Sequence, residues 1–297
     1  MDDIRVAKNR NSVLIGLTII LLIIIMLCGC IEESSEEPIV IAGPNPSPSN
    51  PVISNDKIVF KFYYRGEDEL HRYEIWVYYI NENEAKKLPV EVRSIGNQDI
   101  YKDKIAWVDS YNIYIYNLTT KTKKQITNHP YEVSSPKIFE NSIIWTDYRN
   151  AAGVENYDIY LYDLNINREI QLTYSMAPQG APDIFENNIV WIDWSNGYKG
   201  NIILFDLITN KTIQITNGRG YVSSPKIFND KIIWQEATES HGEGESNIYL
   251  YDISTNMERR ISNSGKAFEP DIYDDKIVWK DIRNGDSYWD GDIYLIF

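Results

Sequence analysis

Apolar and polar positions alternate in short blocks from residue 51 to residue 297, and the same arrangement of blocks returns six times. Each copy has an aromatic residue at the end of an apolar run, and these anchor residues are Phe60, Trp107, Trp145, Trp191, Trp234 and Trp279. Successive anchors are 47, 38, 46, 43 and 45 residues apart. No stretch after residue 30 has the period of an amphipathic helix. The pattern therefore predicts an all-β repeat fold.

The fourth copy, APDIFENNIVWIDWSNGYKGNIILFDLITNKTIQIT, shows the elements of the repeat most completely. Its apolar runs PDIF, NIVWID, NIILFDL and IQIT are separated by polar turns and one variable loop, which predicts four short strands. The third runs, such as Ile159–Tyr162 and Ile248–Tyr251, are apolar or aromatic at every position, so we expect both faces of each sheet to be covered. The sequence thus predicts a six-bladed β-propeller of four-stranded antiparallel blades over residues 51–297.

The sixth copy is shorter than the others, because the chain stops after PDIY, KIVWKD and DIYLIF without a fourth run. A propeller that lacks one outer strand exposes a sheet edge. The β-rich run Pro38–Ala42 has the length and composition to fill that place. We expect Ile39–Ala42 to pair beside Asp292–Phe297 and to close the ring. The alternative is a disordered tether that happens to be apolar.

The repeated segments Pro-x-Ile-Phe/Tyr, Ile-Val/Ile-Trp-x-Asp, Ile-Tyr-Leu-Tyr-Asp-Leu and the closing Gln-Ile/Leu-Thr are similar to a known pattern. They resemble the TolB-type propeller repeat, which is found in many exported bacterial and archaeal surface proteins. The resemblance covers roughly residues 51–297 and implies the fold more strongly than the function. TolB carries an additional N-terminal α/β domain for which this chain has no room, so a role in the Tol system is not expected.

The first thirty residues have the features of an export signal. Three basic residues precede an uncharged apolar run from Val13 to Leu27, and the sequence LCGC follows. This ending resembles a prokaryotic lipobox, in which cleavage precedes the cysteine that receives the lipid, here Cys30. The alternative is an uncleaved signal anchor. We therefore expect residues 1–29 to be a signal peptide or anchor, residues 30–50 to hold the lipid-attachment site, linker and closing strand, and the propeller to lie on the extracytoplasmic face of the cell membrane.

The composition excludes several functions. The net charge of −14 argues against nucleic acid or an anionic membrane surface as a partner. Both cysteines lie in the first thirty residues, so a disulfide framework is not expected in the propeller. The chain contains no HExxH, GxSxG or P-loop motif, and its three histidines are scattered.

Strand direction alternates within a blade, so the turns after the first and third strands share one face, the tight-turn face. Five turns of Asn, Asp and Lys are expected between the first two strands, namely Asn55–Asp56, Lys102–Asp103, Asn187–Asn188, Asn229–Asp230 and Asp274–Asp275. Asp163, Asp206 and Asp252 end the third strands, where we expect them to cap turns. The opposite, long-loop face carries the variable loops, where binding sites usually lie.

Six aromatic residues are the candidate binding residues of the long-loop face, namely Tyr148, Trp194, Tyr198, Tyr221, Tyr288 and Trp289. Exposed aromatic rings beside polar groups suit contacts with a peptide or a sugar. The alternative is that half of them pack on neighbouring loops.

Two sets of charged residues recur at fixed distances from the anchors. Asp109, Asp147, Asp193, Glu236 and Asp281 follow the anchor by two positions, where Phe62 interrupts the series. A ring of carboxylates could hold calcium, but acceptance of backbone N–H groups is the interpretation we favour. The second set precedes the anchor by eight positions, and most of its members follow a proline. Its members are Val52, Asp99, Lys137, Asp183, Lys226 and Asp271. We expect them on the innermost strands, with the prolines at the strand starts, forming ion pairs between blades.

These observations favour a membrane-anchored extracytoplasmic propeller that binds a protein or a glycan without catalysis, and they assign no catalytic residue and no required cofactor. The alternative is a metal-assisted hydrolase or lactonase, or a glycosidase, that uses carboxylates on the long-loop face. A glycosidase needs two carboxylates at a defined separation, which spacing in sequence does not establish.

Overall fold

The computed structural model describes residues 48–65, 71–93, 95–151, 156–239, 244–274, 276–284 and 292–296. All the regular secondary structure in these ranges is β, in 23 strands. No helix within them is long and apolar enough to cross a membrane. The predicted signal segment, Cys30 and the expected closing strand at residues 38–42 all lie outside the described residues.

The strands form six antiparallel sheets, which are the blades. Blade one contains β1 (Pro48–Ser54), β2 (Lys57–Arg65), β3 (His71–Tyr79) and β4 (Glu84–Lys87), and blade two contains β5 (Ile95–Tyr101), β6 (Lys104–Asp109), β7 (Asn112–Asn117) and β8 (Thr122–Gln125). Blade three contains β9 (Val133–Phe139), β10 (Ser142–Asp147), β11 (Asp158–Asp163) and β12 (Arg168–Gln171), and blade four contains β13 (Gln179–Phe185), β14 (Asn188–Asp193), β15 (Asn201–Asp206) and β16 (Lys211–Gln214). Blade five contains β17 (Tyr221–Phe228), β18 (Lys231–Ala237), β19 (Ser246–Asp252) and β20 (Met257–Arg260), and blade six contains β21 (Ala267–Tyr273), β22 (Lys276–Asp281) and β23 (Asp292–Ile296).

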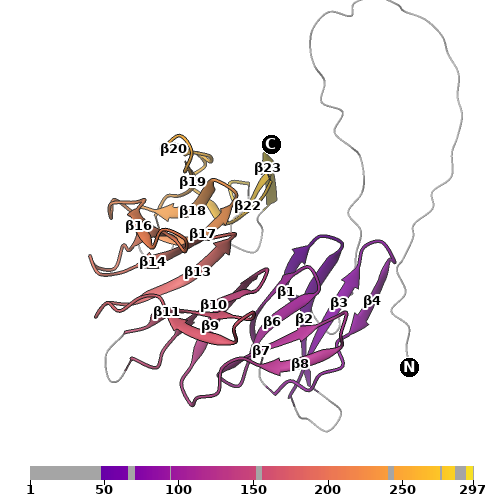
Figure 1. Cartoon of the computed structure of the whole chain (residues 1–297). Helices are drawn as coiled ribbons and strands as arrows, with labels where there is room; N and C mark the ends of the chain where they lie inside the picture. The colour runs from indigo at the N-terminus through magenta and orange to yellow at the C-terminus, as the bar shows by residue number, and fades with distance from the viewer. Residues whose placement is uncertain are drawn as a thin grey trace, which may run out of the picture.

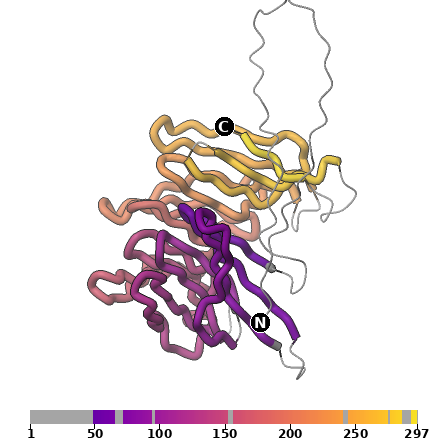
Figure 2. Tube along the Cα trace, turned by 90° about the vertical axis from the view of Figure 1, so that its right-hand side faces the viewer, coloured from indigo at the N-terminus to yellow at the C-terminus, as the bar shows by residue number. Residues whose placement is uncertain are grey.

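The blades are arranged as a six-bladed propeller, as the repeat predicted (Figure 1). Each blade packs on the next in sequence, from blade one to blade six, and the colour in Figure 2 follows this order from indigo to yellow. Blade six has three strands among the described residues, which agrees with the early end of the sixth copy. The outer edge of β23 has no strand partner in the described part of the chain.

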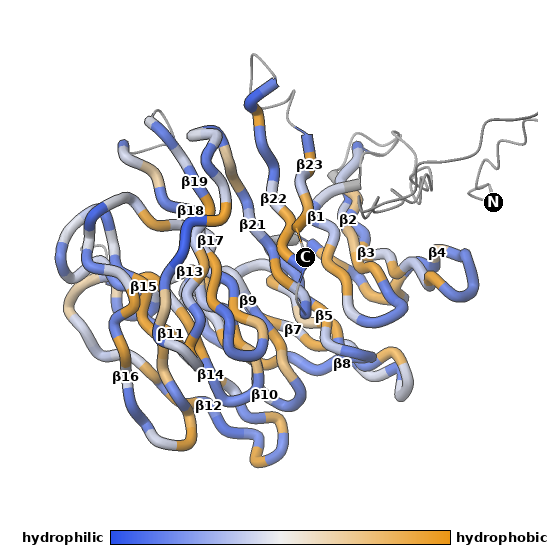
Figure 3. The backbone as a smooth tube through the Cα atoms, turned by 90° about the horizontal axis from the view of Figure 1, so that it is seen from above, coloured by the Kyte–Doolittle hydropathy of each residue, from blue (hydrophilic) through white to orange (hydrophobic). Residues whose placement is uncertain are grey.

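Both faces of a blade are buried because neighbouring residues on one strand pack against different blades. Trp145 of β10 joins a cluster with Ala106 and Val108 of blade two, whereas Ile144 joins a cluster with Ile189 and Trp191 of blade four. The anchors Trp107, Trp145 and Trp234 are fully buried. Figure 3 shows the apolar colours along the strands and the polar colours at the turns. This two-sided burial explains why the third runs are apolar throughout.

The closing segment of the repeat has a structural role in blades two to five. The hydroxyl groups of Thr127, Thr173, Thr216 and Ser262 accept hydrogen bonds from the backbone N–H groups of Ile113, Ile159, Ile202 and Ile248, each at 2.9 Å. In three blades the glutamine side chain donates to the backbone carbonyl of the same threonine, as Gln171 does to Thr173 at 2.8 Å. The segment thus joins the end of the fourth strand to the third strand and satisfies buried backbone groups.

The innermost strands differ from the prediction at their prolines. The prolines were expected at strand starts, but β9 begins at Val133, before Pro136, and the other innermost strands likewise begin before their prolines. Each proline follows a residue with a left-handed backbone (φ between 49° and 52°), and these residues are Asn50, Ser135, Ala181, Ser224 and Glu269. The register shifts at the same places, as between Gly180 and Asp183. A β-bulge leaves a residue unpaired, so the missing N–H of proline costs no ladder hydrogen bond there.

The turns between the first two strands follow the prediction in blades one, two and five and differ from it in blade four, whereas Asp275 of the predicted blade six turn lies outside the described residues. Their first residues are left-handed, with φ between 49° and 57° at Asn55, Lys102, Glu140, Glu186, Asn229 and Asp274. In blade four the turn is Glu186–Asn187 and not Asn187–Asn188, because Asn188 already pairs with Phe185 in the ladder. The two asparagines at 187 and 188 suggested the turn, but the turn begins one residue earlier because the first strand ends at Phe185.

The aspartates that end the third strands cap turns, as predicted. Asp163 accepts the backbone N–H of Asn165 at 2.8 Å, and Asp206 accepts those of Ile208 and Thr209 at 2.7 and 3.0 Å. Asp252 accepts the N–H of Thr255 at 3.0 Å.

Candidate functional site

The long-loop face is built from the ends of the second strands, the starts of the third strands and the links between blades. Of the six candidate aromatic residues, the structure describes Tyr148, Trp194, Tyr198 and Tyr221, whereas Tyr288 and Trp289 lie outside the described residues. The four described residues belong to blades three, four and five. They do not form one continuous set.

Tyr148 and Trp194 pack around a third ring that sequence reasoning did not select, Tyr157. The ring centroids of Tyr148 and Tyr157 are 4.8 Å apart, and those of Tyr157 and Trp194 are 6.0 Å apart. Gly180 lies beside this cluster, because a β-carbon there would come within 3.1 Å of Tyr157 and 3.4 Å of Trp194. Tyr148 and Trp194 are half-buried, so they join the loops of blades three and four.

Tyr198 and Tyr221 lie differently from this pair. The side chain of Tyr198 is among the most exposed large apolar groups of the described residues, at 88%. Tyr221 is half-buried, and the ammonium of Lys199 lies 6.0 Å from the centre of its ring. Tyr198 is therefore available for contact with a partner, and Tyr221 is partly available.

The long-loop face also carries exposed side chains that the sequence analysis did not select. They are Tyr63 at the end of β2, Tyr111 in the turn between β6 and β7, and Tyr131, Tyr174 and Met176 in the links between blades. Tyr174 and Met176 are 76% and 85% exposed. Links lack the repeat pattern, so the sequence offers only their composition as a signal. Tyrosine and methionine are enriched at protein interfaces.

The carboxylates of the proposed metal ring are engaged in hydrogen bonds at the ends of the second strands. Four of them accept a backbone N–H group. The pairs are Asp109 with Arg93 at 3.1 Å, Asp147 with Arg149 at 3.0 Å, Asp193 with Ser195 at 2.8 Å and Asp281 with Arg283 at 3.0 Å. Glu236 instead accepts the side chains of Arg219 at 2.7 Å and Trp234 at 3.1 Å. Within the described ranges, no three His, Cys, Asp or Glu side chains converge as metal ligands would.

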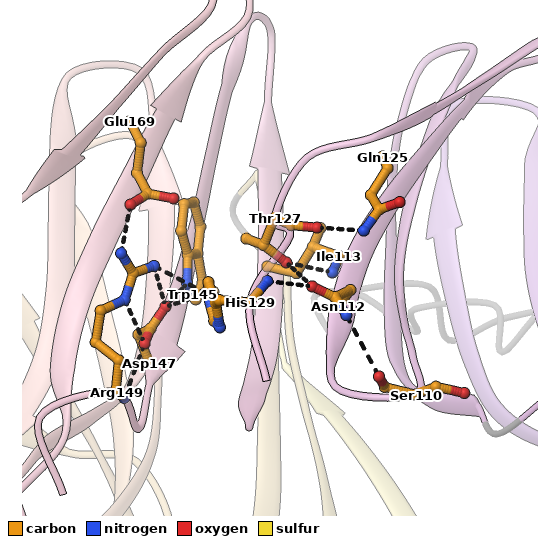
Figure 4. A network of polar contacts seen from close by, with 10 residues as sticks. All are labelled: Ser110, Asn112, Ile113, Gln125, Thr127, His129, Trp145, Asp147, Arg149 and Glu169. Carbon is orange, nitrogen blue, oxygen red and sulfur yellow. Dashed lines mark hydrogen bonds and ion pairs between the residues drawn. The ribbon is translucent and has the colours of Figure 1, made fainter. Parts of the chain in front are cut away.

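Blade three shows the most extended of these networks (Figure 4). Asp147 accepts the indole N–H of Trp145 at 2.8 Å and the guanidinium of Arg149 at 2.9 and 2.7 Å. Arg149 also donates to Glu169 at 2.7 Å, and its Nη2 lies 3.0 Å from Nε2 of His129. Burial alone would raise the pKa of Asp147, but the hydrogen bonds from Arg149 and Trp145 lower it. The carboxylate is thus an ionised structural acceptor.

Blade six repeats this arrangement, and blade five varies it. Asp281 forms an ion pair with Arg283, and the centre of the guanidinium lies 4.2 Å above the ring of Tyr294. Burial opposes ionisation of Asp281, but the hydrogen bonds from Arg283 and Ser264 lower its pKa to about 2. In blade five the guanidinium that pairs with Glu236 belongs to Arg219, which lies in the link before the blade. An arginine is held over an aromatic ring in each case.

Two hollows lie beside blade two on the long-loop face. One of about 360 Å³ lies between blades two and three and is lined by Gly96, Tyr111 and Glu132, among others. A second of about 380 Å³ lies beside Arg93, Asp109 and Lys123. Ser110 lines both hollows, and its hydroxyl donates to Asp109 at 3.0 Å. This face therefore offers a broad, uneven surface.

Comparison with known proteins identifies the fold. No family model and no curated protein sequence matches the chain. Among solved structures, the β-propeller domain of the Trilobed protease from Pyrococcus furiosus is similar with a TM-score of 0.62 and 13% identity, covering 84% of this chain and 80% of that one. A putative TolB from Agrobacterium tumefaciens has a TM-score of 0.57 and 14% identity, covering 75% and 83%. A chain of the nidogen–laminin complex has a TM-score of 0.51 and 11% identity, covering 78% and 86%. The chain therefore has a TolB-like β-propeller fold.

Proposed function

We propose that this protein is a membrane-anchored, extracytoplasmic propeller that binds a partner protein through its long-loop face without catalysing a reaction. The observation that carries the proposal is the group of exposed tyrosine and methionine side chains on that face, from Tyr63 and Tyr111 to Tyr174, Met176 and Tyr198. Exposed side chains on the turns and outer strands are instead mostly aliphatic, such as Ile166 and Ile208.

The shape and chemistry of the long-loop face support a protein more than a glycan. Each of the two hollows described above has one tyrosine in its lining, whereas the exposed aromatic residues of this face are spread over blades one to four. A spread of amphipathic rings over a wide surface is typical of protein interfaces. The structural neighbour in the nidogen–laminin complex shows that a propeller of this kind occurs in a complex of two proteins.

A binding role without catalysis is supported by the state of the carboxylates. Three of the carboxylates that follow the anchors, Asp147, Glu236 and Asp281, form ion pairs with arginine. An ion pair with arginine keeps a carboxylate ionised and occupied, which opposes its use as a general acid.

Anchoring and export rest on the sequence of residues 1–30. The proposal is that Cys30 carries the lipid and that the acidic linker holds the propeller away from the membrane. Mass spectrometry of the protein purified from membranes should find a lipid-bearing Cys30 as the first residue if a lipid is the anchor. An uncleaved signal anchor would leave residues 1–29 attached and Cys30 unmodified.

The binding proposal is tested by chemical crosslinking in cells followed by mass spectrometry. The wild type is compared with the double variant Tyr174→Ala, Tyr198→Ala. Because both side chains are at least three-quarters exposed, the double variant should fold normally. The matched control is Ile166→Ser, Ile208→Ser on the tight-turn face, where the side chains are 61% and 71% exposed. A partner captured by the wild type and the control but lost in the tyrosine variant is expected; equal capture by all three would contradict the proposal.

A further inference from the structure

A larger cavity lies on the propeller axis and opens on the tight-turn face, opposite the proposed protein-binding surface. It has a volume of about 760 Å³ and is lined by the innermost strands of all six blades, from Val52 and Ser54 in blade one to Asp271 in blade six. A volume of roughly 300–1,000 Å³ is typical of small-molecule sites.

A belt of aromatic rings surrounds the mouth of this cavity. Tyr101, Phe139, Phe185, Phe228 and Tyr273 are the last residues of the innermost strands in blades two to six. Successive ring centroids are 4.6, 4.9, 4.5 and 4.8 Å apart. Ser54 takes the same place in blade one, so the belt has one polar gap. The mouth therefore offers an apolar wall to a ligand that enters from the tight-turn face.

Charged side chains of alternating sign line the cavity below the belt. Lys137 pairs with Asp99 at 3.4 Å. The carboxylates of Asp99 and Asp183 also accept the backbone N–H groups of Ile138 and Ile227 on the following blades, each at 2.9 Å. These contacts join blade two to blade three and blade four to blade five. Much of the hydrogen-bonding capacity of Asp99, Lys137 and Asp183 is thus used within the protein.

Lys226 and Asp271 differ from Asp99 and Lys137, which pair with each other, and from Asp183, which accepts an N–H group of the next blade. They lie on the innermost strands of adjacent blades, and both line the cavity. Neither forms an ion pair with a described side chain; Asp271 accepts only the N–H of the next residue, at 3.0 Å. The positive charge of Lys137 and burial lower the pKa of Lys226, against the attraction of nearby carboxylates. An anionic group beside Lys226 would relieve that repulsion. Asp271 is exposed and suits an ammonium group.

We propose that this cavity binds a small zwitterion with an apolar body, of the size of an amino acid or a dipeptide. Its carboxylate would contact Lys226, its ammonium group would contact Asp271, and its apolar part would lie against the aromatic belt. Nine charged residues line the cavity, six acidic and three lysines, and they sum to −3, so the lining offers partners for both charges of a zwitterion and disfavours a plain anion. The cavity opens on the tight-turn face, away from the exposed tyrosines of the long-loop face, although Lys137 and Lys226 also line a smaller axial hollow of about 310 Å³ beside Asn50, Asn97 and Ser135.

The test is isothermal titration of the full-length protein in detergent with L-phenylalanine and L-phenylalanyl-L-phenylalanine. Saturable binding of at least one of the two is expected. Binding should be at least tenfold weaker for 3-phenylpropionate, which lacks the ammonium group, and for 2-phenylethylamine, which lacks the carboxylate. N-acetyl-phenylalanine amide, which mimics the interior of a longer chain, should bind no better than these. Equal affinity for the zwitterions and these analogues would overturn the proposal, as would the absence of saturable binding to the folded wild type.

Variants of the two free charges provide the second arm. Lys226→Met and Asp271→Asn should each weaken binding of the zwitterion at least tenfold, whereas Lys211→Met on the exposed strand β16 should not change it. Asp271 is exposed, so its substitution keeps the test valid if the lysine variant fails to fold. Unchanged affinity in a folded Asp271→Asn protein would refute the role of the ammonium contact.

Discussion

The closing strand can be tested by removing residues 37–43 from the full-length chain. In blade six, Ile293 and Leu295 are 73% and 46% exposed. The residues at the same positions of blade five, Ile248 and Leu250, are 0% and 3% exposed because blade six covers them. We propose that residues 38–42 pair with β23 and, by leading directly into β1, seat blade one against this face of blade six.

The size of the effect follows from these exposures. Burying a whole isoleucine or leucine side chain stabilises a protein by about 1.5–3 kcal/mol, so covering 73% of one and 46% of the other contributes about 2–4 kcal/mol. The backbone hydrogen bonds of a short strand add about 1 kcal/mol each. Deletion of residues 37–43 should therefore lower the free energy of unfolding by at least about 2 kcal/mol.

The measurement is denaturation in urea, followed by tryptophan fluorescence. A deletion of residues 31–36 serves as the matched control, because it removes acidic linker and keeps the apolar run. The double substitution Ile293→Ser, Leu295→Ser should destabilise the wild type by a similar amount but have little effect in the deletion variant, since the face is already uncovered there. An unchanged unfolding midpoint after the deletion would refute the closure.

Three further predictions concern the repeat itself. Asp281→Asn should cost about 2 kcal/mol at pH 7, because its pKa is lowered from 3.8 to about 2, and the difference from the wild type should vanish as the pH falls from 4 to 2 in acid denaturation. Thr173→Val should cost about 1–3 kcal/mol in urea denaturation because it leaves the buried N–H of Ile159 without an acceptor; a cost near zero would remove the proposed role of the closing threonine. Gly200→Ala should lower the melting temperature, because Gly200 has φ of +69° and a β-carbon would lie 2.6 Å from Ile192. Gly197→Ala should lower it less, because nothing lies within 4 Å of a β-carbon there.

The repeat predicted the blades because every copy must meet the same packing requirement. Each second strand presents its anchor to one neighbouring blade and the adjacent residues to the other, so the pattern of apolar residues is visible in the sequence. The turn aspartates were predictable for a similar reason, since Asp206 acts on residues two and three positions away. Local chemistry leaves a local signal.

Contacts between segments leave no such signal. Arg149 and His129 meet Asp147 from a loop and from the preceding link, and Arg219 reaches Glu236 from a link as well. The sequence did not predict the bulge before Pro136, because a proline that follows a short polar run is also typical of the first residue of a strand. The two free charges of the axial cavity became visible only when the distances between blades were known.

Site-specific photo-crosslinking in living cells tests the central claim most directly. A photoreactive amino acid is placed at Tyr174 or Tyr198 on the long-loop face, and at Ile166 or Ile208 on the opposite face, four positions that are all well exposed. The account predicts a discrete crosslinked partner protein from the first two positions and none from the other two. Crosslinks that form equally from both faces, or only from the tight-turn face, would contradict it.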